Sequence, residues 1–333
     1  MRLLVLGGSV FLGRAVVEAA LAEGHEVTTF NRGVSGSDHP RAAAIRGDRT
    51  DPDDLRRLAE VEPWDAVIDT SPQVPRDVLA SAEALSGVRR YVLVTSVSVY
   101  PGWPAERVGS SSATFACAPD AGPDDGHYGE LKAGCERAAT RVLGERAVIV
   151  RPGVILGPHE NVGRLPWWLR RMARGGDVLV PGAATAPFQA VDVRDLADLL
   201  VAVAARPDPP PGPLVAPGPV GRDTYGGWLE LCHAAAGPEA RLVWVDDDFL
   251  SEHGVEPWGE LPLWLPPGPD TAHAFDVDGS SATGWGLTYR PLVATVTDTW
   301  AWLREEPDYA VPERTGLDPV KEQVVLGAWS ARG

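Results

Sequence analysis

Short apolar segments alternate with helical ones through the first half of the chain, and this order constrains the fold more than any other feature of its 333 residues. Apolar, β-branched runs predict strands at 3–6, 26–30, 43–46, 66–69, 91–95 and 147–152. Helices are expected over about 13–22, ending at Gly24, and over 52–60, where Asp51 is the expected cap. Strands separated by helices of this length predict an α/β fold with a doubly wound parallel sheet.

A glycine-rich turn joins the first strand to the first helix, at Gly7-Gly8-Ser9-Val10-Phe11-Leu12-Gly13. At this position of a parallel sheet, backbone amides and the positive end of a helix dipole meet a dinucleotide pyrophosphate. The second strand ends in Asn31-Arg32 rather than in the acid that selects NAD, and an arginine there can meet a 2'-phosphate. Asp48 follows the third strand, where a carboxylate can accept a hydrogen bond from adenine. The pattern predicts a Rossmann site that prefers NADP, with NAD as the alternative.

The rest of the chain predicts a smaller region beside this sheet. Residues 101–126 are rich in Pro, Gly, Ser and Asp and predict a surface loop before a helix that carries Tyr128. Residues 192–204 predict a helix that returns to the sheet, whereas Pro and Gly clusters at 207–219 and 262–269 interrupt regular structure. We expect a dinucleotide-binding domain at 1–155 plus about 188–206, and a C-terminal substrate-binding region at 156–187 and 207–333.

Charge and cysteine content exclude several classes of function. A net charge of −16 and an isoelectric point near 4.8 disfavour binding to nucleic acids and to anionic membranes. No stretch reaches the roughly 20 apolar residues of a spanning helix, and the N-terminus does not read as a signal peptide. Cys117, Cys135 and Cys232 form no CxxC motif and His159-Glu160 lacks metal-ligand spacing, so we expect neither disulfides nor a metal site. A soluble protein of the reducing cytoplasm fits best.

Tyr128 and Lys132 form a Tyr-x-x-x-Lys pair in a chain that contains almost no lysine. Only Lys132 and Lys321 are lysines among its 30 basic residues. Spacing by four puts both side chains of the pair on one helix face, where an ammonium lowers the pKa of a neighbouring phenol. Lysine, unlike arginine, is a compact point charge that fits beside a phenol and a ribose. The pair therefore predicts a proton-transfer device.

From residue 1 to about 200 the chain resembles the extended short-chain dehydrogenase/reductases, also described as the NAD-dependent epimerase/dehydratase family. A weaker match to the family's late segment lies at Gly284-Trp285-Gly286-Leu287 and Arg290-Pro291-Leu292. The main shared motifs are the glycine turn, Asp48, Thr95-Ser96-Val97-Ser98-Val99-Tyr100, Tyr128 with Lys132, Arg151-Pro152-Gly153, and Asp192-Val193-Arg194-Asp195-Leu196-Ala197.

The resemblance implies a role for each catalytic residue. Ser96 would hydrogen-bond the substrate oxygen, with Ser98 as the weaker candidate, and Tyr128 would act as acid and base. Lys132 would bind the nicotinamide ribose and stabilise the tyrosinate. The residues expected at the cofactor are Gly7, Ser9, Val10, Phe11, Leu12, Gly13, Asn31, Arg32, Asp48, Arg49, Thr70, Ser71, Tyr128, Lys132 and Pro152.

Four departures from the family pattern narrow the expected function. Val10 stands where the middle glycine usually lies, and its side chain crowds the approach to the pyrophosphate. Val97-Ser98 replace the acid pair of sugar-nucleotide dehydratases, so 4,6-dehydration is not expected. Val154 and Pro187-Phe188-Gln189 replace groups that hold a substrate diphosphate. We therefore expect a substrate that is not a nucleotide sugar.

The expected function is an NADP-dependent oxidoreductase that reduces a carbonyl, an imine or an activated double bond of a small organic molecule. Ten of the 12 tryptophans follow residue 150, and the Pro-rich stretch 260–266 predicts an apolar pocket for an uncharged substrate. Two alternatives stay open: an epimerase with a retained NAD, and a dinucleotide- or RNA-associated protein without catalysis. A homodimer is common in the resembling family. The pattern identifies neither the substrate nor the direction of the reaction.

Overall fold

A seven-stranded sheet forms the centre of the protein, for which the computed structural model describes residues 1–61, 63–182 and 184–332. The strands run in the order β11-β6-β5-β4-β1-β2-β3, and every neighbouring pair is parallel. This arrangement confirms the predicted doubly wound parallel sheet. The strands are β1 (Arg2–Leu6), β2 (Glu26–Asn31), β3 (Ala43–Arg46), β4 (Ala66–Asp69), β5 (Arg90–Val94), β6 (Ala147–Pro152) and β11 (Leu214–Ala216).

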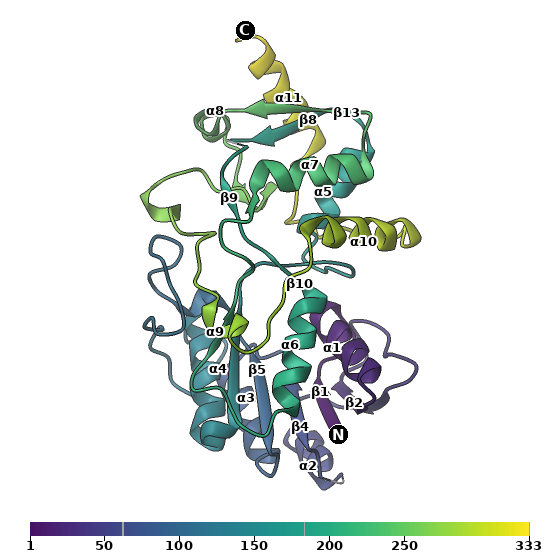
Figure 1. Cartoon of the computed structure of the whole chain (residues 1–333), viewed down its shortest axis with the longest axis vertical. Coiled ribbons are helices and arrows are strands. Elements are labelled where there is room, and N and C mark those ends of the chain that lie inside the picture. Colours follow the sequence, from purple (N-terminus) through teal and green to yellow (C-terminus); the bar gives the residue numbers. More distant parts are fainter. Residues whose placement is uncertain (62, 183, 333) are drawn as a thin grey trace.

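Helices cover both faces of this sheet (Figure 1). On one face, α1 (Phe11–Ala22) packs against α6 (Val193–Ala205) over a core that includes side chains of β1, β4 and β5. On the other face, α3 (Pro75–Ala84) packs against α4 (Tyr128–Leu143), with α2 (Pro52–Glu60) beside α3. Strands that are apolar on both sides need this cover, which explains their near-continuous apolar sequences.

Most predicted elements have bounds within a residue or two of those observed. β3, α2, β4 and β6 have the predicted bounds, whereas α1 begins at Phe11 rather than at 13. Asp51 caps α2 as expected, because its carboxylate accepts a hydrogen bond from the amide of Asp53 at 2.8 Å. Gly24 follows α1 with a left-handed φ of +79°, the conformation that a helix-ending glycine supplies.

The sequence pattern does not reveal α3 or β11. Residues 214–216 lie inside the segment 207–219, which is expected to be irregular, yet they pair with Val150, Arg151 and Pro152 of β6. Three residues between prolines are too few to show a strand pattern. From the sequence, all of 207–333 is expected to belong to the substrate-binding region. Because β11 belongs to the central sheet, that assignment is corrected for residues 214–216. The division into two regions otherwise stays a prediction.

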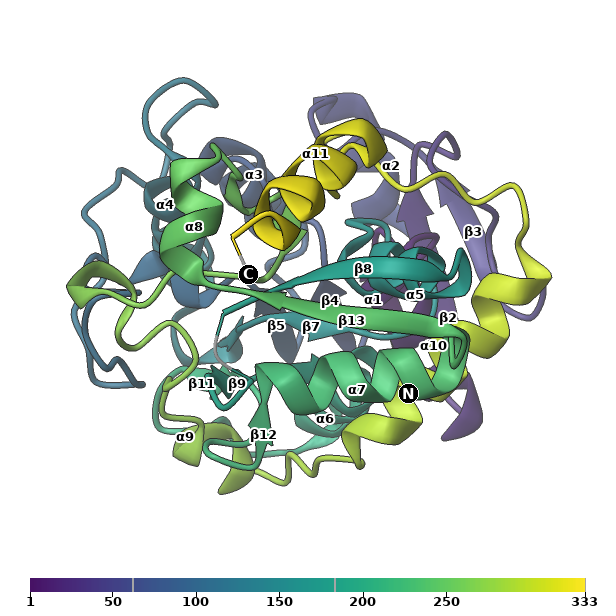
Figure 2. The same cartoon turned by 90° about the horizontal axis from the view of Figure 1, so that it is seen from above.

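A second core lies beyond the carboxyl ends of the central strands (Figures 1 and 2). Trp168 and Trp228 are fully buried in it, so these two tryptophans serve packing. Its elements are the parallel strands β8 (Gly176–Pro181) and β13 (Ala240–Val245) and the helices α5 (Arg164–Ala173), α7 (Tyr225–Ala236), α8 (Asp247–Glu252), α10 (Leu292–Glu305) and α11 (Pro319–Ser330).

Short elements complete the chain, and within the described residues no helix is long and apolar enough to span a bilayer. The short strands are β7 (Ile155–Leu156), β9 (Pro187–Phe188), β10 (Val191–Asp192), β12 (Asp223–Thr224), β14 (Pro257–Trp258) and β15 (Leu261–Pro262). The short helices are η1 (Val97–Val99), η2 (Gly144–Arg146), η3 (Pro269–Thr271) and α9 (Ser280–Thr283).

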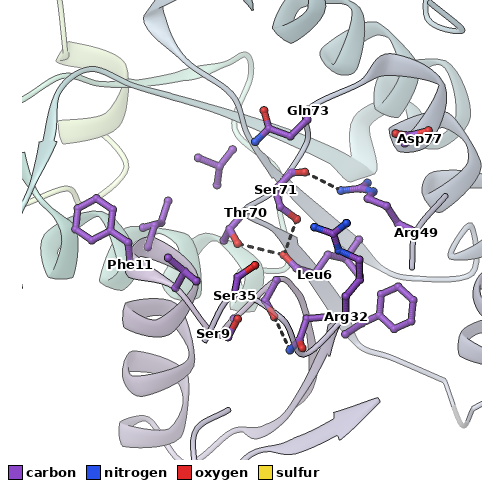
Figure 3. Close-up of a pocket in the computed structure, with 18 of the residues that line it drawn as sticks. Leu6, Ser9, Phe11, Arg32, Ser35, Arg49, Thr70, Ser71, Gln73 and Asp77 are labelled. Carbon is purple, nitrogen blue, oxygen red and sulfur yellow. Dashed lines mark hydrogen bonds between the residues drawn. The ribbon is translucent and has the colours of Figure 1, made fainter. Parts of the chain in front are cut away.

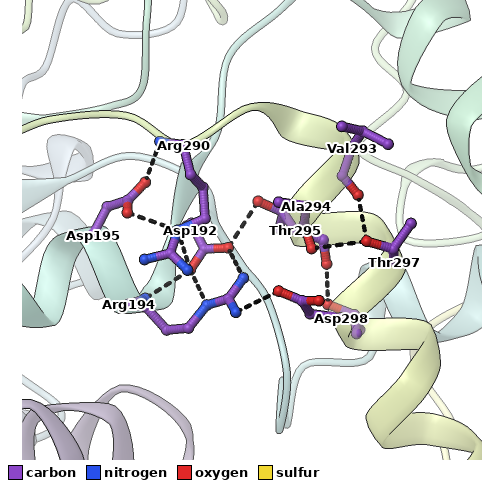
Figure 4. A network of polar contacts seen from close by, with 10 residues as sticks. Asp192, Arg194, Asp195, Arg290, Val293, Ala294, Thr295, Thr297 and Asp298 are labelled. Carbon is purple, nitrogen blue, oxygen red and sulfur yellow. Dashed lines mark hydrogen bonds and ion pairs between the residues drawn. The ribbon is translucent and has the colours of Figure 1, made fainter.

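A polar network joins the start of α6 to the start of α10 (Figure 4). Asp192 accepts hydrogen bonds from Arg194 and, at 2.7 Å, from Thr295 of α10. Asp195 accepts from the backbone amide of Arg290 at 2.9 Å and from its guanidinium at 2.7 Å. Both carboxylates are buried, so the network fixes the second core against the helix that covers the sheet. It also links the family motif at Asp192 to the late motif at Arg290.

Candidate active site

A cleft of about 620 Å³ runs along the carboxyl ends of the central strands. Its walls come from the glycine turn after β1 and from the segments that follow β2, β3 and β4. Figure 3 shows Ser9, Arg32 and Thr70 from three of these segments around it. Every residue expected at the cofactor lines this cleft. The fold therefore brings together residues that are up to 145 positions apart in the chain, from Gly7 to Pro152.

The glycine turn is packed so closely that a side chain at its glycine positions would clash with neighbouring atoms. A Cβ on Gly7, where φ is +106°, would lie 2.8 Å from Oγ1 of Thr70, and one on Gly13 would lie 2.6 Å from the nitrogen of Gly8. α1 begins directly after Val10, a residue with no polar atom to cap the helix, and its first turn carries no acid. The first backbone amides of α1 are therefore available to donate hydrogen bonds to a ligand. Their position at the start of a helix suits a phosphate.

Val10 lines the cleft, as expected from its place in the turn, but it is held on two sides. Its partly buried side chain packs against the core between α1 and the sheet. The loop after β2 lies on the other side, because a Cβ built on Gly36 would lie 3.5 Å from Cγ2 of Val10 and 2.6 Å from the carbonyl oxygen of Ser9. The valine is therefore wedged between the core and this loop.

Asn31 and Arg32 differ in what they do at the end of β2. The amide nitrogen of Asn31 donates to the carbonyl oxygen of Gly7 at 3.2 Å, so this side chain braces the glycine turn. The side chain of Arg32 is 63% exposed and lies 3.9 Å from Asp48. The amide and the hydroxyl of Thr50 donate to Asp48 and lower the pKa of its carboxyl group. Arg32 thus keeps its guanidinium accessible to an anion in the cleft.

Arg49 forms a fixed part of the cleft wall. Its guanidinium donates to the two carboxylate oxygens of Asp69 at 3.0 and 2.8 Å and to the carbonyl oxygen of Ser71 at 3.1 Å. Tyr91 donates to the same carboxylate at 2.9 Å. Burial alone would lower the pKa of Arg49, but the charges of Asp69 and Tyr91 and the hydrogen bond to Asp69 together outweigh burial and raise this pKa. Among the described residues, the buried Nε of Arg49 has no hydrogen-bond partner.

Ser96 and Tyr128 lie where the cleft meets a second cavity, of about 570 Å³. Ser96 lines the second cavity and caps η1, since its Oγ accepts a hydrogen bond from the amide of Ser98 at 3.1 Å. The two serine hydroxyls are also 3.1 Å apart and hydrogen-bonded. The residues that line both cavities are Phe11, Thr95, Tyr128, Pro152 and Ile155.

α4 begins at Tyr128 because His127 and Glu130 form a capping box. Nδ1 of His127 accepts a hydrogen bond from the amide of Gly129 at 3.1 Å, and Glu130 accepts one from the amide of His127 at 2.9 Å. The ring of Phe115 packs edge-on against His127, with ring centres 4.7 Å apart. His127, whose orientation the sequence leaves open, thus serves the start of the helix that carries Tyr128.

Lys132 does not lower the pKa of Tyr128 as the sequence predicts. Its buried ammonium donates to the carbonyl oxygen of Pro72 and lies 5.3 Å from the centre of the Tyr128 ring. Loss of solvent around the phenol raises the pKa of Tyr128, although this residue is still 55% exposed; a hydrogen bond with Ser96 and the charge of Arg164 oppose that rise. The predicted lowering is therefore wrong for this arrangement, because the lysine turns to a backbone carbonyl instead of the phenol.

A buried network positions η1 and α4 relative to each other. Glu136 of α4 accepts hydrogen bonds from Arg151 of β6 at 2.9 and 2.6 Å and from the hydroxyl of Thr95 at 2.7 Å. Arg151 also donates to the hydroxyl of Tyr100 at 2.8 Å. The sequence reasoning missed Glu136. Its signal is its spacing, because Glu136 follows Tyr128 by eight residues and so lies on the same helix face.

Apolar side chains form most of the second cavity. The predicted stretch 260–266 contributes Leu265, and Trp258 also lines the cavity. Trp264 is instead buried and donates its indole N–H to Asp247 at 2.7 Å. Val154 also lines this cavity, where the family usually offers a polar group. The second cavity thus has the apolar character that the Pro-rich stretch predicts.

Comparison with known sequences identifies the family of the chain. Residues 3–80 and 73–215 match the NAD dependent epimerase/dehydratase family. The chain is 33% identical over 219 residues to the 2'-dehydrokanamycin reductase of Streptomyces kanamyceticus, over 62% of this chain and 60% of that protein. It is 28% identical over 211 residues to the chloroplast stem-loop binding protein of 41 kDa b of Arabidopsis thaliana, over 59% and 53%. The matches thus span less than two thirds of these relatives.

The fold is similar to that of a solved UDP-glucose 4-epimerase of Thermotoga maritima, with UDP-glucose, at a TM-score of 0.68. The two are 17% identical over 92% of this chain and 100% of that one, so the likeness shows the Rossmann fold alone. The predicted resemblance is confirmed at the level of the family. The chain belongs to the NAD dependent epimerase/dehydratase family.

Proposed function

We propose that this protein is an NADP-dependent reductase of a small organic carbonyl compound, with an imine or an activated double bond as related substrates. The observation that carries the proposal is the position of Tyr128, which lines both the cleft and the second cavity. Ser96 lies beside it in the second cavity. A proton donor between a dinucleotide cleft and a substrate cavity is what hydride transfer to a carbonyl requires.

Several groups of the cleft fit a dinucleotide. The uncapped start of α1 suits the pyrophosphate, and the buried Nε of Arg49 offers a donor that no described residue uses. Arg32 suits a 2'-phosphate because its guanidinium is exposed at the end of β2. Lys132 would bind the nicotinamide ribose, in exchange for its hydrogen bond to Pro72. When bound, the reduced dinucleotide supplies the hydride that forms the new C–H bond.

Side chains of the protein stabilise the negative charge that develops on the substrate oxygen and supply the proton to it. Tyr128 donates its proton to the substrate oxygen as that oxygen gains the electron pair, and Ser96 donates a hydrogen bond to the same oxygen. Tyr128 is protonated at neutral pH, because an ordinary tyrosine has a pKa of about 10 and loss of solvent raises the pKa of this phenol further. Tyr128 recovers a proton from solvent after the alcohol has formed.

Two other functions have some support. The solved neighbour is a sugar-nucleotide epimerase, and an epimerase would retain its dinucleotide and consume no NADPH. One relative is named for stem-loop binding, but a net charge of −16 opposes association with RNA. A relative named as a reductase, 33% identical over the aligned residues, favours oxidoreduction over both.

Tyr128→Phe tests the proposal when dinucleotide binding and NADPH oxidation are measured in parallel. We expect calorimetry to show unchanged NADPH affinity, and absorbance at the nicotinamide band to show turnover reduced by about 10²- to 10⁴-fold. Tyr289→Phe is the matched control, because the Tyr289 hydroxyl lacks a hydrogen-bond partner among the described residues and lines neither cavity. Full turnover in Tyr128→Phe, or no binding of either dinucleotide, contradicts the proposal. Tightly retained NAD without net NADPH consumption favours the epimerase.

A further inference from the structure

We propose that the second cavity binds an uncharged aromatic carbonyl compound, with its carbonyl at Tyr128 and its ring against Trp103 and Trp258. This inference rests on the proposed function, because it names the substrate class of the same site. Its basis is the distribution of polar groups. The cavity offers the hydroxyl groups of Ser96, Ser98 and Tyr128, the rings of two tryptophans, and no unbalanced charge among its described residues. A volume of about 570 Å³ suits a small organic ligand.

Two tryptophans form a fixed aromatic surface in this cavity. The rings of Trp103 and Trp258 meet edge to face, with centres 6.5 Å apart. Trp258 also stacks with Phe275 at 6.3 Å, and the indole N–H of Trp103 donates to the carbonyl oxygen of Ala274 at 3.3 Å. Because these contacts hold both rings, a ligand meets a preformed surface. An aromatic ligand gains most from such a surface, through area buried and through ring–ring geometry.

The charge of Arg164, which lines the cavity, is already balanced. Its Nε donates to Glu160 at 2.8 Å, and Nη2 donates to the carbonyl oxygen of Ile155 at 2.9 Å. Glu160 is fully buried behind it. No Asp or Glu of the described chain lines the cavity. A charged substrate of either sign would therefore lose its hydration without finding a free counter-charge, and burial of an unpaired charge is costly.

Two further polar side chains of the lining are already used by the protein. The amide nitrogen of Gln189 donates to two backbone carbonyls at 3.0 Å each, and its oxygen accepts from the amide of Val277 at 3.1 Å. The hydroxyl of Thr95 donates to Glu136 at 2.7 Å. Gln189 and Thr95 therefore offer little to a substrate with many hydroxyl or phosphate groups.

The hydroxyl groups that remain are gathered at one point. Ser96 is hydrogen-bonded to Ser98 at 3.1 Å and lies next to Tyr128, which also faces the dinucleotide cleft. A substrate with a single carbonyl at that point and an apolar ring elsewhere matches this distribution. A polyhydroxylated substrate does not, because its other polar groups would lie against tryptophan and leucine side chains.

Calorimetric titration with acetophenones that carry a methyl, a carboxylate or a trimethylammonium group in the para position tests the inference. These probes share the ring and the ketone and differ in charge. With NADP present, we expect the methyl compound to bind at least about 10-fold more tightly than either charged one. We also expect it to bind more tightly than dihydroxyacetone. Equal binding of the three para-substituted ketones, or tighter binding of dihydroxyacetone, overturns the inference.

Variants of one tryptophan locate the binding site. We expect Trp258→Ala to weaken binding of para-methylacetophenone by about 5- to 10-fold, and Trp258→Phe to keep most of it, because a ring is restored. Trp329→Ala is the matched control, since Trp329 packs on Phe249 outside the cavity. If Trp258→Ala and Trp329→Ala lose affinity for para-methylacetophenone to the same extent, the result contradicts a binding site at Trp258.

The two proposals fail in different ways. If para-methylacetophenone binds selectively but no NADPH is consumed with it or with any other carbonyl, the substrate class stands and the reductase proposal fails. If NADPH is consumed with a charged or polyhydroxylated carbonyl while para-methylacetophenone does not bind, the reductase stands and the substrate class is overturned. If para-methylacetophenone does not bind and no NADPH is consumed with any carbonyl compound, both proposals are overturned.

Discussion

Gly129 packs directly on the backbone of Ser98, so that a Cβ at Gly129 would lie 2.1 Å from the carbonyl oxygen of Ser98. This contact joins the start of α4 to η1, and therefore sets Tyr128 beside Ser96. A side chain at Gly129 has to push the helix away from η1, since backbone atoms cannot give way as a flexible side chain does.

Gly129→Ala is therefore expected to lower the free energy of unfolding by about 1–3 kcal/mol, as overpacking does, and to reduce turnover by misplacing Tyr128. Gly327→Ala on α11 is the control, because nothing lies within 4 Å of a Cβ there. The control is expected to stabilise the protein by about 0.5–1 kcal/mol. Urea denaturation and NADPH oxidation measure both effects. Unchanged stability and turnover in Gly129→Ala would refute a tight contact.

Local sequence patterns were enough to predict the elements that shape the cleft. The bounds of β3, α2, β4 and β6 follow from short apolar runs and from the cap at Asp51, which are local features. The glycine turn is also a local feature, because Gly7 has a positive φ of +106° and a Cβ on Gly13 would lie 2.6 Å from the backbone nitrogen of Gly8. These features explain why the residues expected at the cofactor all line one cleft.

Local sequence patterns do not predict contacts between segments that are far apart in the chain. The pairing of Glu136 with Arg151 depends on how α4 packs on β6. The short strand β11 depends on its pairing with β6 at the edge of the sheet. The orientation of Lys132 is a third case. Spacing correctly puts it near Tyr128, but the carbonyl oxygen of Pro72, 60 residues away, decides where its ammonium points.

Arg32→Ala is expected to weaken NADPH binding by about 10- to 100-fold, the value of a hydrogen bond to a charged group, while NADH binding changes little. The reason is that only NADPH carries the 2'-phosphate that Arg32 is proposed to meet. Arg56→Ala is the control, because Arg56 pairs with Asp53 on the exposed side of α2. Calorimetry with both dinucleotides distinguishes the cases. Equal loss for NADPH and NADH contradicts a role in selecting the phosphate.

Tyr128 is expected to ionise above the ordinary tyrosine pKa of about 10, because loss of solvent raises its pKa. The difference in tyrosinate absorbance between the wild type and Tyr128→Phe, recorded without dinucleotide, isolates this one phenol. We expect no difference at neutral pH and a rise only in strongly alkaline solution. Arg164→Met should move the rise to still higher pH, since the charge of Arg164 opposes the shift. A tyrosinate signal near neutral pH would instead show that Lys132 faces the phenol in solution.

His159 is expected to make the protein less stable in acid. Its pKa is lowered to about 4, first by burial and then by the charge of Arg14, while Glu18 acts in the opposite direction and the ring lies 4.9 Å from that of Trp302. The folded state therefore takes up a proton on His159 less readily than the unfolded state, whose histidine pKa is about 6.5. This part of the stability is complete above that value and is lost as pH falls toward about 4.

His159→Asn tests this expectation, because asparagine does not titrate and tolerates the left-handed backbone of residue 159, where φ is +67°. Urea unfolding at several pH values between neutral and mildly acidic gives the free energy of unfolding for both proteins. The carboxylates are common to both, so their contribution cancels in the difference. We expect the wild type to lose more stability on acidification than His159→Asn. Parallel pH profiles would show that His159 is solvated in the folded state and ionises like an ordinary histidine.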